Sequence, residues 1–361
     1  MTVKPCSSRR AVLAGLAGVG ADLFWRGKRS AQAQAANPRR LDLHHHFGTP
    51  AWVRMTNEKK SQGYQVWQPY TPAKAIEDMD RGDVAVSLLS VTTPGIWFGD
   101  KAETRRWARE LNEYGARMVS DYRGRFGLFA VLPLPDVDAS LREIEYAFET
   151  LKADGVGLLS SYGNRWHGDP EFAPVFRELN RRRVVVYTHA SAPPCCQNLQ
   201  PNINETTIEY NTDTSRTIIS LIESGRATEC PDIQFIFSHA GGTIPSLAGR
   251  FLGAAASAES LAQAAPPNSR LYHLRRFYYD TAGSANPVQM VSLKMIVPTT
   301  QIVFGTDFPF GHSAAVAQGL ETSGFRAEEL RGIDRETRCG FCPSSRHRWT
   351  TPGLGRHVNT G

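Results

Sequence analysis

The stretch Leu41–Pro50, LDLHHHFGTP, alternates apolar and polar side chains before three consecutive histidines and a turn. Alternation with period two is typical of a β-strand, and the Gly and Pro that follow mark its end. Side chains two residues apart lie on one face of a strand, so His44 and His46 share a face and His45 points away. The stretch therefore predicts a strand that presents two imidazoles at its carboxyl end, and we assign His45 no role.

Seven further apolar runs follow, separated by segments with helical periodicity such as Asp138–Leu151. Strand alternating with helix eight times over about 250 to 300 residues predicts a single α/β domain, a (β/α)8 barrel of the TIM type. A doubly wound sheet is the alternative, but no Gly-rich phosphate loop follows the first run. The eight runs begin at Leu41, Val84, Arg125, Gly155, Arg183, Ile233, Phe277 and Gln301.

Side chains suited to metal binding or proton transfer gather at the expected carboxyl ends of these strands: His44, His46, His189, His239 and Asp307. In a barrel these ends meet at one face, where active sites lie. Taken singly, each histidine could be a hydrogen-bonded core residue and Asp307 could begin a turn. Together they favour one site, because three neutral imidazoles and a carboxylate suit one divalent ion, zinc first and manganese second.

The chain resembles the amidohydrolase superfamily, and within it the amidohydrolase-2 branch typified by aminocarboxymuconate-semialdehyde decarboxylase. The resemblance extends from Leu41 to Asp334 and implies the metal-dependent hydrolase form of the barrel. The motifs that carry it are DLHHHF at 42–47, YTH at 187–189, SHAGG at 238–242 with Pro245 and Gly249-Arg250 behind it, and FGTDFP at 304–309.

The resemblance implies that His44, His46, His189 and Asp307 bind one metal ion. It also implies that His239 acts as the acid or base and not as a ligand, with Asp307 assisting proton transfer in a hydrolytic reaction. Members with two metals bridge them by a carboxylated Lys at the end of the fourth strand. The fourth run here ends LLSSY at 158–162, without Lys, which favours a mononuclear centre.

The activity predicted from the resemblance is a metal-dependent decarboxylase acting on a small aromatic or unsaturated carboxylic acid. Trp97 and Trp166, after the second and fourth strands, are candidate walls for the substrate, although aromatic residues also pack barrel rims. The family likeness further implies that Arg250 binds substrate carboxylate across a homodimer interface. Hydrolysis of a C–N or C–O bond by the same site, or an inactive metal-binding barrel, are the alternatives.

The formal net charge of +6 is unevenly distributed along the chain. Residues 1–40 hold eight Lys and Arg against Asp22 alone, and residues 337–361 hold four Arg and no acidic residue. The rest of the chain has an excess of five acidic residues. This distribution argues against nucleic acid as a partner, because the predicted barrel is mildly acidic.

The termini flank a barrel expected over residues 37–336. Residues 1–36 are expected to be a twin-arginine-type signal peptide, since Ser8-Arg9-Arg10 precedes a short apolar run and Ala31, Ala33 and Ala35 offer cleavage sites. Export would make the protein periplasmic or secreted, and an unprocessed leader would leave it cytoplasmic. That apolar run is too short for an integral membrane segment. Residues 337–361 form a basic tail without apolar periodicity, which reads like a frameshifted or disordered end.

Overall fold

Eight parallel strands form one sheet in chain order, from β1 to β8. The computed structural model describes residues 40–336 apart from 60, 62, 68 and 201, so the expected leader and tail lie outside the described residues. The strands are β1 Arg40–His46, β2 Val84–Ser90, β3 Phe126–Val131, β4 Gly155–Leu159, β5 Val185–His189, β6 Gln234–Phe237, β7 Tyr278–Asp280 and β8 Ile302–Val303. All eight arise from the apolar runs named above.

The segment after β8 returns to β1 and closes the sheet. The Leu43 amide donates to the Phe304 carbonyl at 3.0 Å, and the Asp307 amide donates to the His44 carbonyl at 2.8 Å. A parallel bridge between His45 and Phe308 continues this seam. The expected (β/α)8 barrel is therefore confirmed, with its last strand reduced to two residues.

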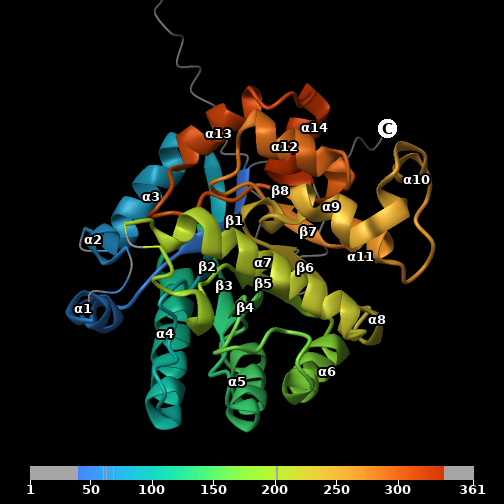
Figure 1. The fold of residues 1–361 in the computed structure, drawn as a ribbon. Helices are drawn as coiled ribbons and strands as arrows, with labels where there is room; N and C mark the ends of the chain where they lie inside the picture. The colour runs from blue at the N-terminus through green and yellow to red at the C-terminus, as the bar shows by residue number, and fades with distance from the viewer. Residues whose placement is uncertain (1–39, 60, 62, 68, 201, 337–361) are drawn as a thin grey trace, which may run out of the picture. The chain divides into compact units, whose positions relative to one another are not determined.

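The helices lie around the outside of the strands (Figure 1). They are α1 Pro50–Glu58, α2 Tyr64–Trp67, α3 Pro72–Arg81, α4 Lys101–Asp121, α5 Val137–Glu149, α6 Ala173–Arg181, α7 Glu205–Glu223, α8 Arg226–Glu229, α9 Ile244–Leu252, α10 Ala258–Ala262, α11 Arg270–Arg276, α12 Pro287–Lys294, α13 Ser313–Glu321 and α14 Ala327–Arg331. Helix α5 shows why they form: Asp136 caps its first turn, and Ile144 and Ala147 on one face are fully buried. None of the helices between residues 40 and 336 combines the length and apolar composition that crossing a bilayer requires.

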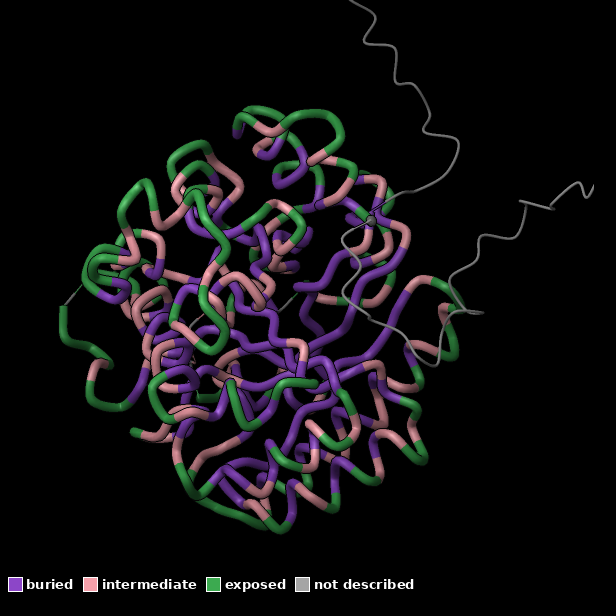
Figure 2. Tube along the Cα trace, turned by 90° about the vertical axis from the view of Figure 1, so that its right-hand side faces the viewer, coloured by how far each residue is buried: buried purple, intermediate pink, exposed green. Residues whose placement is uncertain are grey.

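Two apolar layers hold the barrel together. The larger layer packs the helices against the outside of the sheet, while a smaller cluster that includes Leu43, Phe129 and Tyr187 fills the barrel itself. Figure 2 shows the strands as an almost continuous buried interior under exposed helix faces and loops. The interior cluster closes the barrel below the carboxyl ends of the strands, and the polar side chains of the candidate site gather at those ends.

A bulge in β1 turns the histidines inward. Between Asp42 and His45, β1 advances three residues while its partner β2 advances two, from Ser87 to Leu89. The extra residue breaks the alternation. Leu43 packs in the interior cluster, and yet His44, the next residue, also lies against Tyr187 of that cluster, with ring centroids 5.3 Å apart.

Candidate active site

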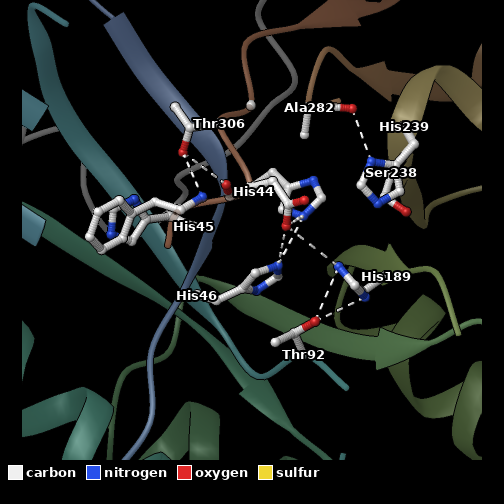
Figure 3. A network of polar contacts seen from close by, with 12 residues as sticks. His44, His45, His46, Thr92, His189, Ser238, His239, Ala282 and Thr306 are labelled. Atoms are coloured by element: carbon white, nitrogen blue, oxygen red, sulfur yellow. Dashed lines mark hydrogen bonds and ion pairs between the residues drawn. The ribbon is translucent and has the colours of Figure 1, made fainter. Parts of the chain in front are cut away.

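Four side chains converge at the carboxyl end of the barrel: His44 and His46 from β1, His189 from β5, and Asp307 from the loop after β8. One donor atom from each lies within 4.8 Å of all the others. The Nε2 atoms of His44 and His46 are 3.0 Å apart, and Asp307 Oδ1 lies 3.1 Å from both and 3.9 Å from His189 Nε2. Figure 3 shows the three imidazoles pointing toward one another.

Each of the three imidazoles is held at its other nitrogen. Nδ1 of His44 lies 2.8 Å from Asp280 Oδ2, Nδ1 of His46 lies 3.0 Å from Ser90 Oγ, and Nδ1 of His189 lies 2.7 Å from the Ala190 carbonyl. The carboxylate and the carbonyl can only accept, so Nδ1 carries the proton in His44 and His189. The Nε2 lone pairs then face the common centre, which is the arrangement that metal-binding histidines require.

Burial and charge favour the ligand forms of His46, His189 and Asp307. Burial lowers the pKa of His46 well below its ordinary value and that of His189 to about 4, so both are neutral near pH 7. Burial opposes ionisation of Asp307, but the charge of His44 and hydrogen bonds from the imidazoles hold its pKa well below the usual range. Although burial disfavours the charged His44, the carboxylates of Asp280 and Asp307 raise its pKa to about 10, so His44 has to release the proton on Nε2 when it binds a metal ion. The two carboxylates, Asp280 and Asp307, give the site a negative charge that favours binding of a cation.

His45 belongs to a different network on the outer side of β1, away from the other histidines (Figure 3). Its Nδ1 lies 3.0 Å from Asp42 Oδ2, and its ring stacks on Phe308 with centroids 4.8 Å apart. Asp42 also accepts from the Thr306 amide at 3.0 Å and the Thr306 hydroxyl at 2.7 Å. This network ties β1 to the loop that carries Asp307.

His239 lies beside the four-residue group without joining its donor set. It begins a short turn after β6 at φ +54°, whereas the sequence pattern placed it on the strand, and Asp307 likewise follows β8 at φ +64°. Its ring centroid is 5.1 Å from that of His44, and its Nδ1 donates to the Ala282 carbonyl at 2.9 Å. Its Nε2 is therefore the nitrogen that can exchange a proton.

Asp280 is a candidate functional residue that the sequence analysis missed. Its Oδ1 accepts from the His239 amide at 2.9 Å and the Ala282 amide at 3.1 Å, while its Oδ2 holds His44. One fully buried carboxylate thus orients both a candidate ligand and the candidate acid/base. Its place at the end of β7 was the available signal, because that end meets the same face as the histidines.

A cavity of about 690 Å³ lies on the side of β2, β4 and β5, and its lining includes sequence neighbours of the site residues but none of the four-residue group itself. Its lining residue Thr93 follows Thr92, whose hydroxyl lies 3.2 Å from His189 Nε2, and its lining residue Ser191 comes two positions after His189. Trp97 lines this cavity, as a substrate wall would. The volume falls in the range of small-molecule sites.

The other two predicted substrate residues do not line this cavity. The Trp166 indole N–H donates to the buried carboxylate Asp213 at 2.7 Å, and Trp166 is not among the residues that line this cavity. Arg250 has an exposed side chain on α9. A substrate contact from Arg250 within its own subunit has no support from this placement.

Known proteins resemble this chain over most of its length. A family model described as amidohydrolase matches residues 41–333. The chain is 36% identical over 324 residues to decarboxylase yanB of Aspergillus niger, covering 84% of this chain and 87% of that protein. It is 35% identical over 288 residues to 6-methylsalicylic acid decarboxylase of Penicillium expansum, covering 75% and 85%. A dihydroxybenzoic acid decarboxylase structure from Polaromonas, solved with bound manganese, superposes with a TM-score of 0.70 at 19% identity, covering 83% and 95%.

These relatives decide between the enzyme classes that the sequence left open. They are decarboxylases, which supports a metal-dependent decarboxylase over a hydrolase. The group of three buried histidines and one aspartate supplies the donors for a divalent metal ion. With the family model matched over residues 41–333, the chain belongs to the amidohydrolase family, in its amidohydrolase-2 branch.

Proposed function

We propose that this enzyme removes the carboxylate of a small aromatic acid. The ring of this acid carries a hydroxyl group next to the carboxylate, as in 6-methylsalicylic acid. The observation that carries the proposal is the group of three histidines and one aspartate, beside which Thr93 and Ser191 line a cavity of about 690 Å³. The 6-methylsalicylic acid decarboxylase, at 35% identity, supplies the substrate class.

The chain's own residues provide the proton that the reaction consumes. Decarboxylation adds a proton to the ring carbon that bears the carboxylate, after which the carbon–carbon bond breaks and carbon dioxide leaves. His239 is the donor, because the Ala282 carbonyl fixes its Nδ1 and leaves Nε2 to carry the transferred proton. Asp307, whose side chain is 20% exposed, is the member of the four-residue group most open to substrate.

The four donors would hold one divalent ion, and the fixed Nδ1 partners show that they fit it. Bound there, the ion supplies Lewis-acid stabilisation of negative charge on the substrate. Zinc is the first candidate from the donor set, and manganese, which the Polaromonas structure contains, is the second. Elemental analysis of protein purified without chelator is expected to find about one ion per chain, and two ions would contradict a mononuclear centre.

The activity is tested with purified protein and 6-methylsalicylate in the presence of zinc or manganese. We expect carbon dioxide and 3-methylphenol in equal amounts, with activity lost after chelation and restored by the metal. Stable substrate under all metal conditions, or hydrolysis of amide or ester substrates instead, would overturn the proposal.

Two further expectations belong to the same proposal. Arg250 serves substrate binding only if a second subunit brings it to the site, so the enzyme is proposed to be a homodimer, which light scattering would show.

Residues 1–36 are proposed to direct export through Arg9 and Arg10. The mature chain from the native host should then begin close to Gln34 or Ala36, and an intact leader would contradict export.

A further inference from the structure

Beside the cavity, a buried carboxylate on α7 gathers hydroxyl groups from two strand ends. Asp213 is fully buried, and its Oδ2 accepts from the hydroxyls of Ser160 at 2.5 Å and Ser161 at 2.8 Å. Its Oδ1 accepts from the Trp166 indole at 2.7 Å and lies 3.6 Å from the Arg216 guanidinium. All of these partners are donors, so they use the acceptor capacity of the carboxylate.

Two serines of this network, Ser161 and Ser191, line the cavity. The Ser191 hydroxyl lies 2.9 Å from Ser160 Oγ, 3.3 Å from Ser161 Oγ and 3.5 Å from Asp213 Oδ2. Ser160 and Ser161 give their hydrogens to Asp213, and the Ser191 hydroxyl can donate to any of these three oxygens. Ser161 therefore offers the cavity lone pairs and no hydrogen, and Ser191 does the same while its own hydrogen bonds to one of these oxygens, so this wall accepts hydrogen bonds.

We infer that Ser161 and Ser191 determine specificity for a substrate with a second hydrogen-bond donor, such as a phenolic hydroxyl, on the ring edge turned toward β4 and β5. Asp213 is the positioning residue, because it fixes the direction of the serine hydroxyls. The inference rests on the proposed function for the choice of aromatic acids. It explains the polar strand ends at 160–161, where the sequence has serines in place of a bridging lysine.

The test compares 2-hydroxybenzoates that carry either a hydroxyl or a methoxy group at ring position 4 or 5. Methoxy can accept a hydrogen bond but cannot donate one. We expect the wild-type enzyme to prefer the better hydroxyl compound on the order of tenfold in kcat/KM, the size of one hydrogen bond. The phenols that lack the carboxylate, 3-hydroxyphenol and 3-methoxyphenol among them, give the same comparison by calorimetric binding without turnover.

Three variants separate a directional role from a structural one. Combining Ser161→Ala with Ser191→Ala should reduce the preference to within about twofold, since no acceptor is left. Asp213→Asn should lose or reverse it, because the amide N–H₂ donates to a serine oxygen and turns a hydroxyl hydrogen toward the cavity. Thr212→Ala, beside Asp213 on α7 but outside the lining of this cavity, is the control and should keep the preference.

Equal binding of hydroxyl and methoxy compounds by the wild-type protein, or a preference that survives in the double serine variant, overturns the inference. If Asp213→Asn does not fold, the double serine variant decides. A hydroxyl preference that depends on the serines, found without release of carbon dioxide, supports the inference and refutes the proposed function. Decarboxylation without any preference for the hydroxyl compounds supports the proposed function and refutes the inference.

Discussion

Replacing Asp280 by Asn tests whether this one carboxylate organises the metal group. An Asn side chain can keep the two backbone hydrogen bonds from His239 and Ala282 through its oxygen. Its amide nitrogen then faces the His44 Nδ1–H, and two donors cannot bond. His44 must release Nδ1 or move its proton to Nε2, where it blocks the lone pair needed by the metal.

The expected loss follows from the single contact that changes. A hydrogen bond between a charged acceptor and an imidazole is worth about 1.5–3 kcal/mol, and a tenfold change in affinity corresponds to about 1.4 kcal/mol. Metal affinity should therefore fall roughly 10- to 100-fold, as is usual when the partner of a metal-binding histidine is removed. Competition against a chromophoric chelator measures this change directly.

Asp78→Asn is a matched control at a carboxylate that contacts none of the four donors. Asp78 has one oxygen 2.9 Å from His312 Nδ1 and accepts the Ser313 amide with the other at 2.9 Å, so the same exchange of groups occurs there. It should leave metal affinity unchanged. Unchanged affinity in Asp280→Asn, or an equal loss in both variants, would refute the reasoning.

Three other changes test separate parts of the structure. His239→Ala should keep the metal and lose roughly 10²- to 10⁴-fold in kcat, the contribution of a positioned proton donor, and loss of the metal by elemental analysis would make His239 a ligand. His189→Ala should remove most of the metal because three donors remain, and unchanged metal content would contradict the ligand assignment. Burial lowers the pKa of His167 to about 4, so the unfolded chain binds a proton that the folded chain excludes as the pH falls below 6.5. Between pH 7 and 5 the wild-type protein should lose about 2 kcal/mol more unfolding free energy than His167→Gln in urea titrations, and equal losses would contradict this assignment.

The sequence predicted the barrel well because each strand corresponds to a separate apolar run in the sequence. Strands buried on both faces are apolar along their length. The carboxyl ends of the parallel strands of a barrel lie at one face, whatever helices and loops connect the strands. For that reason His189 of β5 and Asp307 beyond β8 could be assigned to one place before any contact was known. The inward direction of His44 was expected from simple alternation, but it depends on the bulge after Asp42, which no sequence period records.

Partners of individual side chains could not be predicted, because they depend on distant parts of the chain. Trp166 was expected beside the substrate, yet its indole bonds to Asp213, 47 positions away. Asp280 escaped notice because its motif YYDT carries no spacing that marks a ligand. Gly305 shows the same limit: a Cβ there would lie 2.8 Å from the Cβ of His44 and 2.9 Å from that of Asp280, a crowding visible only in three dimensions.

Because the barrel closes between β1 and the segment after β8, the donors of the metal group are synthesised at very different times. Two of its donors are among the first barrel residues to leave the ribosome, and Asp307 is among the last. A growing chain that has not yet reached Asp307 can offer the ion only the histidines. An ion held by the full donor set would therefore bind only after Asp307 has been made, and it would connect β1 with the segment after β8.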